Sequence, residues 1–461
     1  MQARNLLGVS VATAALAGLL FGFDTAVVAG VTGDLVRVFD LTPASLGLTV
    51  SSALWGTLLG ALLIGSPGDR FGSRNALRVL ALFYIVSGVG SAIAWDWGSL
   101  IFFRFIGGIA IGGSSVLAPV YISEIAPPAR RGALVGMFQF NVVLGILVAY
   151  LSNGVIGALL DGSEVWRWKL GAAAAPAVVL LVLLYRIPNS PRWLAAKQRG
   201  AEAAEVLANI GIADPRGELK QIERSLAEER SHAGVKLSWA RHGKPILLAF
   251  GLASFNQLAG INAILYYLND IFAAAGYGAV SADRQAVAIG VANLLFTALG
   301  MMLIDRVGRK TLLLVGAAGM TACLSVVAVV LFGHLPEALL LWMLIGFIAF
   351  FAVSQGAVIW VYLSEIFPTS VRARGAALGS TTHWLWNALI SGVFPAVAAV
   401  SRGAPFLFFA GMMALQFVLV LIFFPETRGV ALEEMEERLG GSRDTAGAGG
   451  APAGTTATVS A

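Results

Sequence analysis

Residues 68–74 read Gly-Asp-Arg-Phe-Gly-Ser-Arg, and residues 305–310 read Asp-Arg-Val-Gly-Arg-Lys. The aspartates of the two stretches, Asp69 and Asp305, are 236 positions apart (305 − 69). Two more motifs recur in the same order at nearly the same interval, residues 121–125 with 362–366 and residues 188–192 with 425–429. Three ordered motifs at one interval indicate an internal duplication, so the chain is expected to fold as two related halves.

The composition is that of an integral membrane protein. Of 461 residues, 57% are hydrophobic and 12% are charged, with a mean hydropathy of +0.80, whereas soluble domains carry about 25% charged residues. The 54 glycines suit membrane helices that pack closely. We assign the net charge of +5 to cytoplasmic loops and expect no nucleic-acid partner. The single cysteine, Cys323, excludes an intramolecular disulfide and a cysteine-rich metal site.

About twelve apolar segments are long enough to cross a bilayer core of about 30 Å. They fall into two groups of six, at about 6–31, 44–66, 76–95, 98–122, 133–158 and 168–187, and at about 243–273, 285–304, 311–333, 337–363, 375–400 and 405–424. An even number of spans in each half gives both halves the same orientation, which is the parallel repeat of a two-bundle transporter.

Four units follow from this pattern: an N-terminal bundle (1–187), a polar linker (188–242), a C-terminal bundle (243–424) and a tail (425–461). Within the linker, residues 201–210 and 218–230 have helical spacing with mixed charges, typical of solvated helices. The tail is expected to be mostly disordered after residue 440, since it is rich in Gly, Ala, Thr and Ser.

The basic residues of the short loops set the orientation. If the spans alternate, ten arginines and lysines fall on one side: Arg70, Arg74, Arg78, Arg130, Arg131, Arg306, Arg309, Lys310, Arg372 and Arg374. The positive-inside rule makes that side cytoplasmic. We therefore expect a multi-pass plasma-membrane protein in the lipid bilayer, with both termini and the linker in the cytoplasm.

Asp24 is the only ionisable residue in the first apolar run. A carboxylate near mid-membrane costs roughly 3 kcal/mol on insertion scales. The sequence favours a protonatable group that faces a polar path, with an Asp near a helix end and open to water as the alternative. Arg104 is the other isolated charge inside a span of this half, and opposite charges in a low dielectric are expected to pair.

The motifs above, together with Phe-Gly-Phe-Asp-Thr-Ala-Val-Val-Ala-Gly (21–30) and Asn-Gln-Leu-Ala-Gly-Ile-Asn-Ala-Ile-Leu-Tyr-Tyr (256–267), resemble the sugar porter family of the major facilitator superfamily. The resemblance covers about residues 10–435. It implies an all-α major facilitator fold that carries sugars or polyols by alternating access and functions as a monomer. We expect no enzyme activity, cofactor or metal, because the chain has no metal cluster, nucleophile motif or phosphate-binding loop.

A sugar site needs amides for the hydroxyl groups and a flat apolar surface for the ring. Gln257 and Asn262 are about one and a half helical turns apart, so both can face one site only if the seventh helix is broken, with Gly260 as the weak point. The resemblance implies substrate contacts at these two residues and at Phe21, Gln139, Ile146, Asn256, Tyr266, Asn293, Trp360, His383, Trp384 and Asn387, with Tyr266 closing the outer gate.

Several positions depart from the family pattern. Asn256 replaces the first Gln of a usual pair, and His383 stands where relatives usually have Asn or Gln. An imidazole, with an ordinary pKa of about 6.5, adds a source of pH dependence. Ala357 replaces a usual Pro in the tenth span. These departures fall at positions where the resemblance implies substrate contacts or the flexibility of the tenth helix.

The resemblance also implies two mechanical devices. In the first, Asp24 is protonated from outside and releases Arg104, which permits occlusion with sugar bound; a static ion pair is the alternative. The second is a cytoplasmic latch that holds the outward-open state. Its members are Asp69, Arg70, Arg74, Glu124 and Arg130 in the first half, and Asp305, Arg309, Glu365, Arg374 and Glu426 in the second. Asn189 and Ser73 replace a usual Glu and Arg, so the first-half latch is expected to be the weaker.

The leading hypothesis is a proton-coupled symporter that imports a hexose or pentose. The alternatives are a proton symporter for myo-inositol or another polyol, a facilitative sugar uniporter, and a non-transporting sugar sensor.

Overall fold

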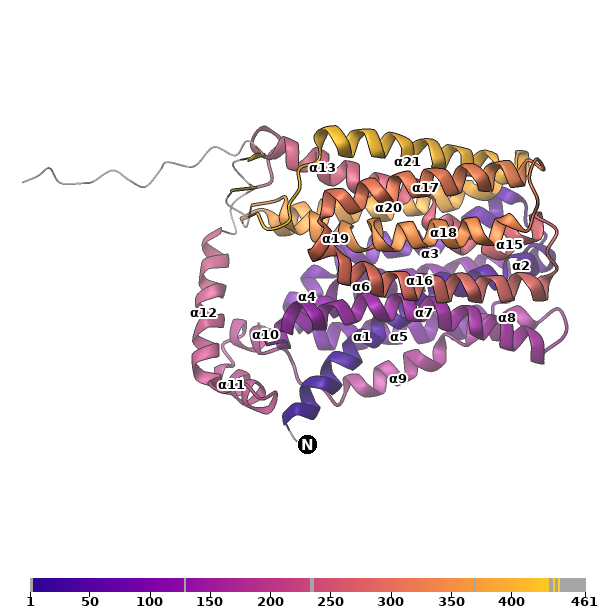
Figure 1. The fold of residues 1–461 in the computed structure, drawn as a ribbon. Helices are drawn as coiled ribbons and strands as arrows, with labels where there is room; N and C mark the ends of the chain where they lie inside the picture. Colours follow the sequence, from indigo (N-terminus) through magenta and orange to yellow (C-terminus); the bar gives the residue numbers. More distant parts are fainter. Residues whose placement is uncertain are drawn as a thin grey trace, which may run out of the picture.

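The computed structural model describes residues 3–127, 130–232, 236–368, 370–430, 434–435 and 438–439. The tail after residue 440, which we expected to be disordered, lies outside the described residues. All secondary structure in the described part is helical (Figure 1).

The first half contains α1 (Ala3–Val27), the short 3-10 helix η1 (Val28–Gly30), α2 (Thr32–Phe39), α3 (Pro43–Leu63), α4 (Gly65–Phe71), α5 (Ser73–Ala92), α6 (Trp97–Ile125), α7 (Arg131–Leu159), α8 (Val165–Gly171) and α9 (Ala174–Leu184). The linker contains α10 (Pro191–Ala196), α11 (Gly200–Asn209) and α12 (Pro215–His232). The second half contains α13 (Trp239–Leu258), α14 (Ile261–Tyr266), α15 (Leu268–Ala274), α16 (Ala279–Val307), α17 (Arg309–Leu331), α18 (Leu339–Val353), α19 (Gln355–Glu365), α20 (Arg372–Val400) and α21 (Ala404–Phe423).

Twelve helical stretches in the described residues are long and apolar enough to span a membrane, which confirms the predicted number. Helices α10 to α12 and the N-terminus lie at one end of the bundle, at the left of Figure 1, and α2, α8 and α15 lie at the other. We call these the linker end and the far end.

The repeated motif makes the same backbone turn in both halves. Gly72 separates α4 from α5 with φ +86° and ψ 145°, and Gly308 separates α16 from α17 with φ +100° and ψ 156°. Both angles lie in the region that only glycine adopts without strain. The duplication therefore specifies a tight turn between the second and third spans of each half.

The seventh and tenth spans are interrupted, as is the sixth, in which α8 ends at Gly171 and α9 begins at Ala174. In the seventh, α13 ends at Leu258 and α14 begins at Ile261, with Gly260 at φ +81° between them, so the expected break at Gly260 is present. In the tenth, Ser354 (φ −113°, ψ −94°) separates α18 from α19. The break forms although Ala357 stands in place of the usual Pro.

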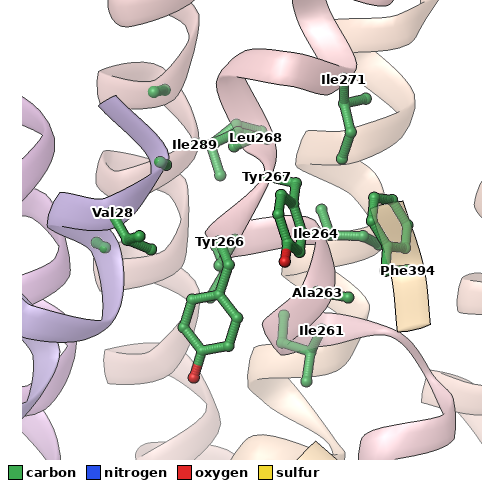
Figure 2. Packing of buried hydrophobic residues seen from close by; sticks show 14 of the residues in the cluster. Val28, Ile261, Ala263, Ile264, Tyr266, Tyr267, Leu268, Ile271, Ile289 and Phe394 are labelled. Atoms are coloured by element: carbon green, nitrogen blue, oxygen red, sulfur yellow. The ribbon is translucent and has the colours of Figure 1, made fainter. Parts of the chain in front are cut away.

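The two halves share a hydrophobic core only toward the far end. One cluster contains residues of both halves, such as Val28, Tyr150, Ile264 and Phe394. Figure 2 shows Val28 of η1 beside Tyr266 and Ile289 of the second half, and the ring of Tyr267 against that of Phe394. The other two clusters belong to one half each.

Very close backbone contacts form this seam between the halves. A Cβ on Gly47 of α3 would lie 1.9 Å from the carbonyl oxygen of Gly392 in α20. A Cβ on Gly290 of α16 would lie 3.1 to 3.2 Å from atoms of Tyr150 and Leu147 in α7. The glycines thus permit helices of opposite halves to touch, as small residues do in membrane bundles.

Candidate functional site

Asp24 and Arg104 form a buried ion pair between α1 and α6. Arg104 Nη1 lies 2.9 Å from Asp24 Oδ1, and the two residues are 5% and 8% exposed, respectively. The nearby Arg104 Nε is buried without a hydrogen-bond partner. The pairing expected from the sequence is therefore present, and each charge offsets the desolvation cost of the other.

A small cavity adjoins this pair. Its lining includes Thr25, Tyr266 and Trp384 together with Asp24 and Arg104, so it touches both halves. Its volume is about 10 Å³, room for at most about one water molecule. In this state the ion pair is nearly sealed, and the cavity beside it is far too small for a sugar.

The amides of the broken seventh helix form one hydrogen-bonded network. Gln257 Nε2 donates to Asn256 Oδ1 at 3.0 Å and lies 3.2 Å from the ring nitrogens of His383. Asn262 Nδ2 donates to Gln257 Oε1 at 3.0 Å. The break at Gly260 thus brings residues 257 and 262 to one place, as the sequence required. The amide Nε2 of Gln257 can only donate, so the His383 ring nitrogen that accepts this hydrogen bond is an unprotonated one, and the tautomer decides which of the two it is.

Aromatic rings surround this network. His383 lies 5.3 Å from Trp360 and 5.0 Å from Trp384, between ring centroids. Trp384 also lies 5.6 Å from Phe21, a contact from α20 to α1 across the two halves. Flat apolar faces therefore stand next to amide donors and acceptors, which is the combination that a sugar requires.

Of the remaining residues expected to contact substrate, some lie close to one another and others do not. Asn387 Nδ2 lies 3.3 Å from the hydroxyl of Tyr266, and Ile146 is buried. Asn293 contacts Thr297, one turn along the same helix. In the described residues no hydrogen bond joins Asn293 or Gln139 to the amide network, so this state does not gather all twelve residues.

The second-half latch is assembled at the linker end. Arg309 bonds Glu365 at 2.8 Å and lies 3.1 Å from Asp305. Glu426 accepts the backbone N–H groups of Arg309 and Lys310 at 2.9 and 3.0 Å, so its carboxylate caps α17. Arg374 is also engaged.

The first-half latch differs from the expected ion-pair cluster. Asp69 and Arg70 are exposed, and no ion pair in the described residues includes either. Arg74 Nη1 donates instead to the carbonyl of Ile187 at 2.9 Å. Glu124 has a partner, and Arg130 is exposed. The replacements explain the asymmetry: Ser73 occupies the position of Arg309, and the buried Oδ1 of Asn189, the counterpart of Glu426, has no partner.

Several polar groups that the fold brings together are not among the residues expected from the sequence. Tyr150 of α7 donates to the carbonyl of Leu265 in α14 at 3.0 Å, joining the halves. Gln355 and Gln416 bond at 2.7 Å inside the second half. Asp270, near the end of the seventh run, lies in the seam between the halves. A search for every charge near the end of an apolar run would have found Asp270; nothing in the sequence singles out Tyr150.

Two six-span bundles around a buried ion pair and an amide–aromatic cluster define a membrane carrier of the major facilitator type. The profile of the family described as "Sugar (and other) transporter" matches residues 10–439, and the chain belongs to this family.

Named relatives agree with this assignment. The chain is 38% identical to the arabinose-proton symporter of Bacillus subtilis, over 92% of this chain and 93% of the relative. It is 34% identical to the D-xylose-proton symporter of Escherichia coli (92% and 94%) and 35% identical to the glucose facilitated diffusion protein of Zymomonas mobilis (92% and 95%). The inward open structure of the E. coli xylose transporter superimposes with a TM-score of 0.84 at 33% identity, over 94% and 99% of the chains.

Proposed function

We propose that the protein is a proton-coupled symporter that imports a monosaccharide, with Asp24 as the proton carrier. The observation that carries this proposal is the buried Asp24–Arg104 pair beside a cavity that also touches Tyr266 and Trp384. Protonation of Asp24 removes the attraction that holds Arg104, and the arginine then becomes free to rearrange with sugar bound. The relatives named as proton symporters for arabinose and xylose support the same reaction.

The substrate contacts of this proposal are the amides of Asn256, Gln257 and Asn262 with the rings of Trp360, His383 and Trp384. The other expected contacts join when the site closes around sugar: Phe21, Gln139, Ile146, Tyr266, Asn293 and Asn387. A myo-inositol or other polyol symporter fits the same groups, since polyols present the same hydroxyl chemistry.

The described state fits the inward-facing step of the cycle. The ion pairs of Arg309 with Asp305 and Glu365 lie within the second half, so they do not hold the two halves together at the linker end. The halves share a core at the far end and have separate cores elsewhere, and the basic loops lie at the linker end. We assign the linker end to the cytoplasm by the positive-inside rule. The high similarity to an inward open xylose transporter supports this assignment.

The test is uptake into proteoliposomes that contain the full chain. Counterflow with hexoses, pentoses and polyols, at one acidic and one neutral external pH, identifies the substrate. An imposed proton gradient should then drive that substrate to a higher concentration inside than outside, with alkalinisation of the medium.

Asp24→Asn should abolish this accumulation, while Asp34→Asn, which removes a carboxylate paired with Arg37 at the surface of α2, should leave it intact. The competing function is facilitated diffusion, as the Zymomonas relative is named. If the wild-type protein only equilibrates its sugar, or if Asp24→Asn still accumulates it, proton coupling through Asp24 is wrong. A chain that binds sugar without counterflow would instead be a sensor.

A further inference from the structure

Asp270 of α15 lies in the seam between the halves at the far end. Helix α15 belongs to the second half and packs against η1 of the first half. The hydroxyl of Thr32, the first residue of α2, faces the Asp270 carboxylate. Asp270 Oδ2 is inaccessible to solvent and has no hydrogen-bond partner. Contact between the halves therefore buries one oxygen of this carboxylate.

The space beside Asp270 is mostly apolar. A cavity of about 360 Å³ exposes the rest of the side chain and is lined from both halves by residues such as Leu41, Leu46 and Phe394. Its other two polar residues are bonded elsewhere. Tyr267 donates to the carbonyl of Ser391 at 2.9 Å, and Arg402 donates to the carbonyl of Ala274 at 2.8 Å.

Four charged groups on the neighbouring elements have other partners, and Arg284 of α16 is exposed. Lys169 of α8 donates to the carbonyl of Gly30 at 2.9 Å. Asp283 of α16 accepts a hydrogen bond from Asn269 at 2.6 Å, and Asp34 and Arg37 of α2 pair with each other. The hydroxyl of Tyr266 bonds Asn387. Across the described ranges, no cation lies within ion-pair distance of Asp270.

An ionised carboxylate with one oxygen cut off from water is destabilised unless it gains a counter-ion or a proton. Separation of the halves at the far end exposes Asp270 to water, where the ionised form is stable. Closure removes water from Oδ2 and brings no cation of the described residues within ion-pair distance of the carboxylate. Because no counter-ion is in reach, the Asp270 carboxylate can be neutralised here by binding a proton.

We propose that Asp270 is a second proton-binding site, occupied when the far-end seam closes and emptied when it opens. The proton enters and leaves from the same end, so it is not carried across the membrane. Asp270 thus differs from Asp24: it makes closure of the outer gate depend on external pH. This inference does not depend on which sugar is carried or on proton coupling through Asp24.

The direction and range of the effect follow from linkage. The seventh span ends at Tyr266, earlier than the expected residue 273, so α15 lies beyond it, and burial raises the pKa of Asp270 to about 6. In the open state the ordinary value is about 3.9. Between about pH 4 and about pH 6, closure takes up a proton, so the closed-to-open ratio falls up to tenfold per pH unit as the pH rises. Below and above that window the ratio is constant.

The test measures the seam directly in the absence of sugar. Spin labels at exposed Val38 (α2) and Leu335 (before α18), on a Cys323→Ser background in lipid nanodiscs, report the distance across the far end. In the otherwise wild-type protein, the short-distance population should fall as the pH rises through the window. Asp270→Asn, which is always neutral, should stay closed throughout. Asp283→Asn, the matched removal of a neighbouring carboxylate, should keep the titration.

Asp270→Glu keeps a titratable group and should keep a pH-dependent step, which separates loss of the proton site from misfolding. A wild-type titration that persists in Asp270→Asn, or that Asp283→Asn removes equally, would overturn the proposal. Because no sugar is added, failure here leaves the result of the uptake experiment unaffected.

Discussion

At the scale of single residues, the stability of the buried Asp24–Arg104 pair is open to a direct test. Asp24→Asn leaves the Arg104 charge buried without its ionic partner, which typically costs about 3–5 kcal/mol. Replacing both residues, as in Asp24→Asn/Arg104→Met, removes that unpaired charge. We expect thermal unfolding in detergent to show a large loss of stability for the single variant and a smaller loss for the double variant.

If the double variant instead lost more stability than the single variant, Arg104 would have gained a new partner once Asp24 is neutral. A neutral Asp24 would then not release the arginine, and the coupling step proposed above would lose its physical basis. The pair itself was predictable, because Asp24 and Arg104 are isolated charges within spans of the first half. Its nearly sealed cavity was not predictable, since Tyr266 and Trp384 arrive from the second half.

At the scale of elements, the break in the seventh span depends on a glycine in two ways. Gly260 has φ +81°, and a Cβ there would lie 2.3 Å from the ring of Phe409. Gly260→Ala adds backbone strain of about 1–2 kcal/mol as well as that clash. We expect a lower melting temperature and weaker sugar counterflow, because Gln257 and Asn262 lose their alignment.

Gly411→Ala is the matched control, since a Cβ at Gly411 in α21 would meet no atom within 4 Å. It should be neutral or slightly stabilising, as alanine is the better helix former. Equal effects of the two substitutions would contradict the special role of Gly260.

The latches provide a second prediction for elements. Glu365→Gln removes the charged partner of Arg309, whose side chain is only 9% exposed, and hydrogen bonds to charged groups contribute about 1.5–3 kcal/mol. Asp69→Asn changes an exposed residue outside any ion pair in the described part of the chain. Melting curves should show a clear loss for the first variant and almost none for the second. Comparable losses would indicate that Asp69 also has a stabilising partner.

These elements show how far the sequence predicts the structure. Spans, turns and the Gly260 break follow from local chemistry, namely apolar length, glycine and the spacing of amides. The exposure of Asp69 and Arg70 agrees with the replacements at Ser73 and Asn189, while a weaker first-half latch stays a prediction. The surroundings of Asp270 do not, because Asp270 meets Thr32 only when segments more than 200 positions apart pack together, and no local pattern encodes the conformational state.

At the scale of the whole molecule, the ratio of the state closed at the far end to the state open there depends on how closely the halves approach at that end. Gly47 and Gly392 touch there, and a Cβ at Gly47 would lie 1.9 Å from a backbone oxygen that has no freedom to rotate away. Gly47→Ala therefore forces α3 and α20 apart. Because packed interfaces are bistable rather than continuously deformable, we expect the population to shift toward the state that is open at the far end.

The distance between Val38 and Leu335 labels should then lengthen in Gly47→Ala at every pH, including acidic pH at which Asp270 is neutral. Gly33→Ala on the neighbouring α2, where a Cβ meets no atom within 4 Å, should leave the distance unchanged. The two substitutions therefore have different effects on the seam. Asp270→Asn removes the pH dependence of its closure, and Gly47→Ala increases the shortest distance between the halves. If the label distance in Gly47→Ala stayed short, the halves would close in spite of the added Cβ. The close contact of Gly47 with Gly392 would then not limit closure.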